Sequence, residues 1–177
     1  MKYLLCILSV STMLLSSCNS NSTTGTNNNN NGGTNNTAAN TMTVTIDGTN
    51  YTMVASGGKG ASGGVTVTSI AGADATGKGV GFSLTNITTA GPYSFGYSVG
   101  AAGLTGAILT YTYTVGSDNI VYSSSTVPGV TSGTLTIQEL TATSCKATFT
   151  GTVTKIQGTA GANTVSITNG SVNATIY

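Results

Sequence analysis

From Met42 onward, apolar side chains alternate with small or polar ones, most often threonine, and this alternation constrains the fold more than any other feature of the chain. Clear examples are Met42, Val44 and Ile46, and later Val80, Phe82 and Leu84. Because successive side chains of a β-strand point to opposite faces, a period of two predicts strands with one buried and one exposed face. Threonine and valine favour strands, and no stretch has the period of an amphipathic helix. We therefore predict an all-β domain over residues 42–177.

Turn signals divide the alternating segments into about ten short strands. Asp47-Gly48, residues 116–119 and Asn169-Gly170 predict tight turns, and residues 56–64 and 100–106 predict glycine-rich loops. Sequential hairpins pair antiparallel, and about ten such strands have to curl in order to bury one face. The predicted architecture is an antiparallel β-sandwich, and a flattened β-barrel is the alternative that the sequence leaves open.

The apolar residues of each segment predict its buried face, and the threonines predict its exposed face. Besides the two examples above, the predicted buried faces are Val65/Val67/Ser69, Tyr93/Phe95/Tyr97/Val99, Leu109/Tyr111/Tyr113/Val115, Leu135/Ile137, Cys145/Ala147/Phe149/Val153, Val165/Ile167 and Val172/Ala174/Ile176. The threonine rows are Thr43/Thr45, Thr66/Thr68, Thr110/Thr112/Thr114, Thr134/Thr136 and Thr148/Thr150/Thr152/Thr154. A flat threonine array is one way to bind ice or a crystalline polymer. The simpler interpretation is that threonine is the ordinary solvent-facing residue of a sheet with few charges, and no fixed repeat favours the array.

Leu15-Ser16-Ser17-Cys18 has the pattern of a lipobox. Met1-Lys2 is a short positive segment, and the apolar run at residues 4–15 is too short to span a bilayer, which needs ~20 residues. The segment resembles bacterial lipoprotein signal peptides. The resemblance implies that residues 1–17 are removed, that Cys18 carries a diacylglycerol and that the new amino group is acylated. Two or more chains, palmitate among them, anchor a protein stably, whereas an ordinary secretory signal is the alternative.

Residues 18–41 hold the lipidated cysteine and a tether rich in Asn, Ser, Thr and Gly. Without apolar periodicity this tether is predicted to be disordered and to span roughly 25–30 Å. Cys6 falls in the signal and Cys18 carries the lipid, so Cys145 is left without a disulfide partner. Since Cys145 shares a predicted face with Ala147 and Phe149, we expect a buried thiol rather than a reactive nucleophile.

The scarcity of ionisable side chains restricts the chemistry of the chain. It contains no histidine, so Ser-His-Asp and Cys-His mechanisms and imidazole metal sites are excluded. It also lacks the basic patch that a nucleic-acid partner requires. Asp47, Asp74, Asp118 and Glu139 are the remaining acid–base candidates, but their spacing does not predict the facing pair of a glycosidase. Asp118-Asn119 supplies too few oxygens for calcium, which needs 6–8. We predict no catalytic residue, no cofactor and no metal.

Two aromatic rows are candidates for sugar binding, because exposed rings stack on sugars. One row is Tyr93, Phe95 and Tyr97, and the other is Tyr111 and Tyr113. The same predicted faces also carry valine and leucine, so the simpler interpretation places these rings in the core. Exposure of the rings therefore separates a glycan-binding domain from a structural one.

The segments Thr45–Tyr51, 132–137, 147–152 and 167–171 resemble those of a group of small uncharacterised all-β lipoproteins of Gram-negative bacteria. The resemblance implies an all-β fold and a lipid anchor, and it carries over no catalytic residue. We predict an outer-membrane lipoprotein, with the periplasmic face favoured over the cell surface because no acidic run follows Cys18. Its non-catalytic domain is expected to bind or support a glycan or an envelope protein. The alternatives are a carbohydrate-binding lipoprotein of a glycan-uptake system and, third, an enzyme.

Overall fold

The computed structural model describes residues 37–100, 103–125, 127 and 129–177, and it confirms the predicted all-β class. The predicted signal peptide, Cys18 and the tether up to residue 36 lie outside the described residues. The described strands are β1 (Thr41–Ile46), β2 (Thr49–Ser62), β3 (Val65–Ala73), β4 (Gly79–Thr85), β5 (Gly91–Ser94), β6 (Gly96–Gly100), β7 (Gly103–Val115), β8 (Asp118–Ser123), β9 (Gly133–Leu140), β10 (Ser144–Gln157) and β11 (Thr164–Thr175). In this described part, no helix has the length and apolar character needed to cross a membrane.

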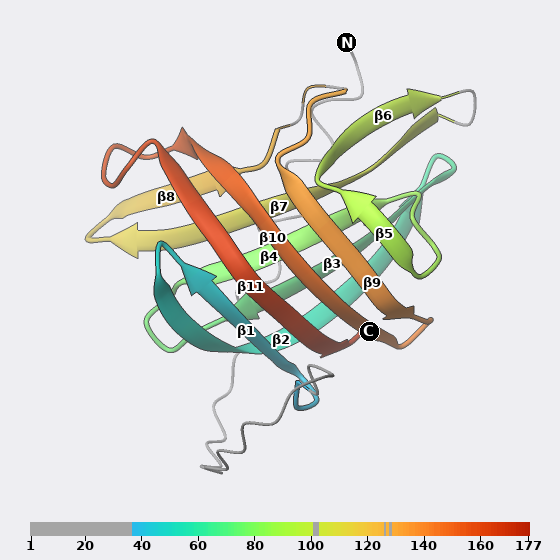
Figure 1. The fold of residues 1–177 in the computed structure, drawn as a ribbon, viewed down its shortest axis with the longest axis horizontal. Coiled ribbons are helices and arrows are strands. Elements are labelled where there is room, and N and C mark those ends of the chain that lie inside the picture. The colour runs from blue at the N-terminus through green and yellow to red at the C-terminus, as the bar shows by residue number, and fades with distance from the viewer. Residues whose placement is uncertain (1–36, 101–102, 126, 128) are drawn as a thin grey trace. The chain divides into compact units, whose positions relative to one another are not determined.

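The strands form two layers that face each other (Figure 1). The layer in front in Figure 1 has the order β5–β9–β10–β11–β1, and the layer behind has the order β2–β3–β4–β7–β8. The strands of the two layers cross at a steep angle in this view, and β6 pairs with the end of β7. Antiparallel hairpins of this kind leave each layer with one face for the core and one for solvent.

Two shared strands join the layers into a closed ring. β2 pairs with β1 over Thr49–Val54 and with β3 over Val54–Ser62, so it turns the corner between the layers. β10 pairs with β9 in its first half and with β8 from Thr154 onward, which closes the opposite side. The ring runs through eight strands, β11–β1–β2–β3–β4–β7–β8–β10. The structure therefore agrees with both predicted architectures, because its two facing layers form a sandwich and its closed ring of strands forms a flattened barrel.

The core lies between the layers and is built by the predicted alternation of β1, β4, β9, β10 and β11. Its members from these strands are Met42, Val44, Ile46, Val80, Phe82, Leu84, Leu135, Ile137, Cys145, Ala147, Phe149, Val153, Val165, Ile167, Val172 and Ala174. Phe82 connects the layers, because its ring centroid lies 5.6 Å from that of Phe149 in an edge-to-face contact. Such aromatic pairs add roughly 0.5–1.5 kcal/mol beyond the area that they bury.

The prediction that Val65, Val67 and Ser69 form the buried face of β3 is wrong. Val65 and Val67 are half-buried, whereas Thr68 and Ile70 face the core. The reason is the register with β4, which places Ile70 opposite Phe82. Because directly opposite residues of neighbouring strands share a face, the strong apolar row of β4 decides which face of β3 is buried. The predicted loop at residues 56–64 is also too long, since β2 continues to Ser62 and only two glycines turn the chain.

The predicted strand from Tyr93 to Val99 is broken into β5 and β6. The break lies at Phe95 and Gly96, where Gly96 has a φ of +149° and the carbonyl of Val130 occupies the space of a Cβ. Only glycine fits at this point. Beyond the break Val99 is 69% exposed, and Val115 at the end of β7 is 51% exposed. The prediction that these two valines belong to the core is therefore wrong.

Asn169-Gly170 is a bulge inside β11 rather than the predicted turn. The register of β11 shifts against β10 between Phe149 and Gly151, and it shifts against β1 between Thr43 and Thr45. Asn169 has a φ of +51°, which a turn residue also adopts, so the same residue type serves both structures. By contrast, the hairpin turn predicted at Asp47-Gly48 is confirmed, with φ values of +45° and +83°.

Candidate functional site

The two aromatic rows lie in the core rather than on an open face. Phe95, Tyr97 and Tyr111 are buried, and Tyr93 and Tyr113 are half-buried. The interpretation of these rings as core residues is therefore confirmed. They do not form an exposed platform on which a sugar ring is able to stack.

The buried tyrosines instead form a cluster under the β10–β11 loop. The ring centroids of Tyr111, Tyr113 and Tyr122 are 5.4 to 6.2 Å apart. The Tyr122 hydroxyl donates a hydrogen bond of 2.9 Å to the Ala162 carbonyl, and burial raises the pKa of Tyr122 to about 12. The cluster is a structural element, because its rings pack on one another and the Tyr122 hydroxyl binds the β10–β11 loop.

Two of the four carboxylates hold hairpins together. Asp118 accepts hydrogen bonds from the backbone N–H and the hydroxyl of Thr159, at 2.9 and 2.8 Å, and these bonds lower the pKa of Asp118. Glu139 accepts from the Ser144 hydroxyl at 2.6 Å and from Lys146 Nζ at 3.0 Å, and both bonds lower the pKa of Glu139. Both carboxyl groups are therefore ionised acceptors near neutral pH rather than proton donors.

The other two carboxylates also bond at turns. Asp47 accepts from the backbone N–H of Ser166 at 2.8 Å. Asp74 accepts from the N–H groups of Thr76 and Lys78, and although slight burial raises the pKa of Asp74, these hydrogen bonds outweigh it and lower the pKa. Among the described residues no three potential metal ligands come together. Each of the four carboxylates thus accepts hydrogen bonds that hold a turn or hairpin in place.

Cys145 is buried, as predicted. Burial and, to a smaller extent, the charge of Glu139 together raise the pKa of its thiol to about 12. A thiol with this pKa is almost entirely protonated at neutral pH, and the protonated form is a poor nucleophile.

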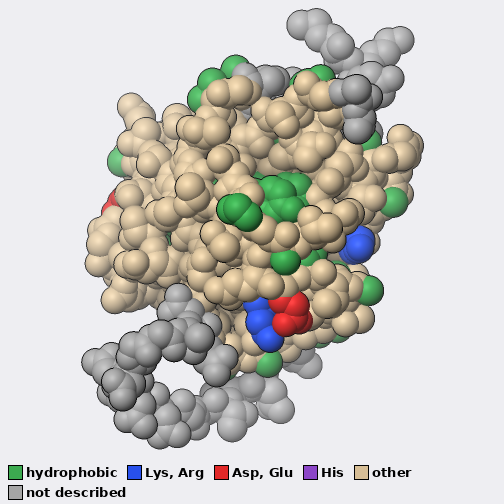
Figure 2. Space-filling view, turned by 45° about the vertical axis from the view of Figure 1, so that its right-hand side comes forward, with side chains coloured by type: hydrophobic (Ala, Val, Ile, Leu, Met, Phe, Trp, Pro, Cys, Tyr) green, Lys and Arg blue, Asp and Glu red, His purple; other side chains and the backbone are tan. Residues whose placement is uncertain are grey.

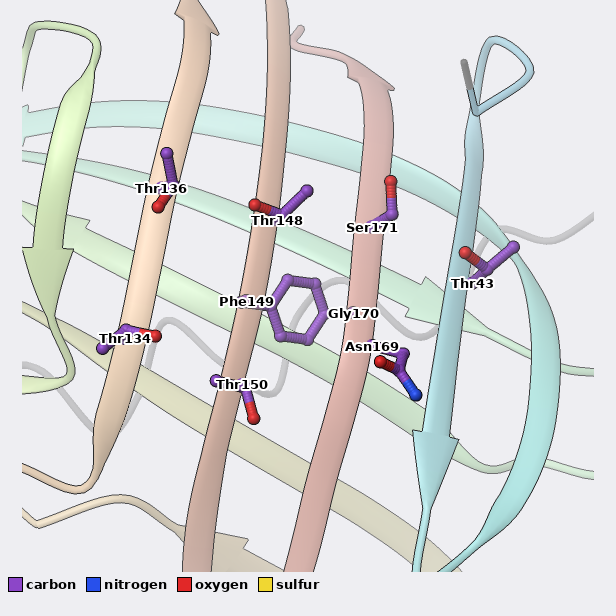
Figure 3. Close-up of a pocket in the computed structure, with 9 residues that line it drawn as sticks. All are labelled: Thr43, Thr134, Thr136, Thr148, Phe149, Thr150, Asn169, Gly170 and Ser171. Atoms are coloured by element: carbon purple, nitrogen blue, oxygen red, sulfur yellow. The ribbon is translucent and has the colours of Figure 1, made fainter. Parts of the chain in front are cut away.

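A groove of about 560 Å³ lies on the outer face of β9, β10, β11 and β1 (Figure 3). It is lined by Thr43, Thr134, Thr136, Thr148, Phe149, Thr150, Asn169, Gly170 and Ser171. None of these side chains carries a charge. Uncharged polar side chains and backbone also cover most of the surface seen in Figure 2.

Strand register places the hydroxyls of the groove in rows. Thr136, Thr148, Ser171 and Thr43 are directly opposite one another across four neighbouring strands. Because paired strands lie roughly 4.8 Å apart, this row extends over about 14 Å. Thr134 and Thr150 form a second, shorter row two residues further along the strands. We call the first set the hydroxyl row.

The floor of the groove depends on the bulge in β11. Gly170 lies opposite Phe149, and a Cβ on Gly170 would lie 2.5–2.6 Å from three carbons of the Phe149 ring. The ring therefore occupies the space that a side chain at Gly170 would need, and in Figure 3 it lies between β10 and β11 beside Gly170. Asn169 precedes Gly170 on β11 and lines the groove on the side of β1.

The hydroxyls of the groove differ in their hydrogen bonds. The Thr150 hydroxyl donates to the Ile167 carbonyl at 3.0 Å, and the Ser171 hydroxyl is 2.6 Å from that of Thr37. Within the described residues, the hydroxyls of Thr43, Thr134, Thr136 and Thr148 make no hydrogen bond to protein. The groove thus presents four hydroxyls that are available to a ligand.

The threonine rows were visible in the sequence, but their meeting in one groove was not. The pairing of β1 with β11 joins residues more than a hundred positions apart, and no local signal predicts it. The sequence does not identify Ser171, Asn169 and Gly170 as groove residues, because Asn-Gly predicts a turn between strands and not a bulge within one. Comparison of the chain with protein-family models, curated proteins and solved structures gives no match.

Proposed function

We propose that the chain is a lipid-anchored lipoprotein of the outer membrane, facing the periplasm, whose β-domain binds or supports another envelope component without catalysis. The observation that carries this proposal is the division of roles among polar side chains. The carboxylates hold turns and hairpins, whereas the groove is lined by uncharged side chains, four of whose hydroxyls make no hydrogen bond within the part of the chain that the structure describes. Groups arranged in this way favour recognition over proton transfer.

The anchor part of the proposal is supported by the lipobox and by the way in which the chain enters the domain. Asn40 is fastened on both sides, because its carbonyl accepts from the N–H of Ala55 at 2.8 Å and its side chain accepts from the N–H of Thr175 at 2.9 Å. The segment that precedes β1 is thus fixed to the domain from Thr37 onward.

Metabolic labelling with radioactive palmitate tests the anchor. The wild-type chain should be labelled and should sediment with outer membranes. Cys18→Ser should be unlabelled and released, because the lipobox Leu15-Ser16-Ser17-Cys18 predicts that Cys18 accepts the diacylglycerol. Cys145→Ser is the matched control and should be labelled like the wild type. Continued labelling of the Cys18→Ser variant would contradict the proposal.

A second candidate function is a carbohydrate-binding lipoprotein that serves glycan uptake. The groove favours it, since unpaired hydroxyls on a concave face match the chemistry of sugars. The aromatic rows do not, because their rings are in the core. Carbohydrate binding by this domain therefore has to rest on hydrogen bonds from the groove rather than on ring stacking.

A further inference from the structure

We infer that the hydroxyl-lined groove binds a neutral polysaccharide, whose chain lies across β9 and β10 toward β11. This inference rests on the binding role proposed above and names the ligand class and the residues. Its first support is the hydroxyls of Thr134, Thr136 and Thr148, which project from neighbouring strands into one groove (Figure 3) and make no hydrogen bond to another described residue. A threonine hydroxyl donates one hydrogen bond and accepts others, as a sugar hydroxyl does, so the two are complementary in either direction.

The second support is a hydroxyl from outside the sheet that already docks on the row. The Thr37 hydroxyl is 2.6 Å from that of Ser171, and Asn173 Nδ2 donates to the Thr37 carbonyl at 3.0 Å. Ser171 is buried, so its hydroxyl is held in place. Thr37 thus shows how Ser171 of the hydroxyl row receives a hydroxyl, while Asn173 beside the row binds the neighbouring carbonyl. It occupies the β11 position and leaves Thr136 and Thr148 open for a ligand.

The charges around the groove select a neutral ligand. Lys146 is the cation two residues before Thr148 on β10, and its Nζ is 3.0 Å from Glu139, so its charge is already compensated. An anionic polymer would lose hydration in the groove without gaining a cation, and an apolar ligand would leave the hydroxyls without partners. A polymer of uncharged sugars avoids both costs.

Affinity electrophoresis tests the inference with the lipidated protein purified from membranes in detergent. The gels contain mixed-linkage β-glucan, xylan or dextran as neutral probes, and polygalacturonate as the anionic probe. We expect at least one neutral probe to retard the wild-type protein and polygalacturonate to leave its mobility unchanged. Thr136→Val and Thr148→Val remove a hydroxyl while keeping a β-branched side chain, and each should weaken binding roughly 2- to 10-fold.

Two matched variants keep the test sharp. Thr148→Ser retains the hydroxyl and should bind within about two-fold of the wild type, since the net hydrogen bond is preserved. Thr152→Val changes the same face of β10 outside the groove and should bind like the wild type. The inference is overturned if no neutral probe retards the folded protein, if polygalacturonate retards it equally, or if both valine variants bind like the wild type. Palmitate labelling without glycan binding contradicts only this inference, whereas glycan binding without labelling contradicts only the anchor.

Discussion

Substitution of Gly170 by alanine should destabilise the domain, because the Phe149 ring fills the space of the new methyl group. A Cβ on Gly170 would lie 2.5 Å from Phe149 Cδ2 and Cε2 and 2.6 Å from Cζ, whereas Cβ atoms in proteins essentially never approach another atom closer than 3.0 Å. Optimal carbon–carbon contacts are about 3.5–4.0 Å, so the ring or the strand has to move by about 1 Å.

The ring has little room for such a movement. Phe149 is 4% exposed and packs edge-to-face against Phe82, which is itself buried on the opposite layer. Overpacking of a filled core costs about 1–3 kcal/mol. Replacing glycine by alanine in a strand regains about 0.5–1 kcal/mol, because the unfolded chain loses freedom. The steric cost exceeds this gain, and we expect Gly170→Ala to lower the free energy of unfolding by about 1–2 kcal/mol.

Urea unfolding followed by far-ultraviolet circular dichroism measures this change. Gly60→Ala is the matched control, since Gly60 also lies in a strand and a Cβ there would meet no atom within 4 Å. The control variant should be as stable as the wild type or more stable by about 0.4–1 kcal/mol. An unchanged slope with a lower midpoint for Gly170→Ala would assign the effect to stability rather than to a changed unfolded state.

A double-mutant cycle identifies the cause. Phe149→Leu removes the ring atoms that collide, so it should be destabilising alone but should relieve the collision in the Gly170→Ala background. The two changes should couple by at least about 0.5 kcal/mol, and the double variant should be more stable than the sum of the single effects predicts. Additive effects, or a Gly170→Ala variant as stable as Gly60→Ala, would refute the proposed packing of Phe149 on Gly170.

Two further predictions concern ionisable groups. The Cys145 thiol, buried and with its pKa raised to about 12, should react with a maleimide only as fast as the domain unfolds, and rapid reaction of the native protein would place it on the exposed face. Hydrogen bonds from Thr159 lower the pKa of Asp118 in the folded state below its ordinary value of 3.8. The stability that the Asp118 carboxylate contributes is therefore fully present above pH 3.8, and it is lost as the pH falls through the folded-state pKa. Asp118→Asn should therefore weaken the dependence of the urea midpoint on pH below about 4, and an unchanged acid limb would contradict this.

Several features of the fold were predictable from the sequence, because they depend on neighbours along the chain. The side chains of a strand alternate whatever the strand pairs with, so Phe82 and Cys145 were correctly placed in the core. Asp47-Gly48 predicted its hairpin because two positive φ angles in succession suit a tight turn between strands. The absence of histidine also excluded several catalytic mechanisms without any reference to the structure.

The groove and its floor were decided only by tertiary structure. Val67 lies outside the core because β3 pairs with a more strongly apolar strand, β4. Asn169 is part of a bulge because β11 pairs with β10 on one side and with β1 on the other. Thr148 and Thr43 came to share a row through β11, which lies between their strands. Local propensity fixes which residues form a strand and how they alternate, but the order and register of strands follow from which faces pack together across the whole domain. A site built from four strands therefore exists only once β1, β9 and β10 have paired around β11 in the correct register.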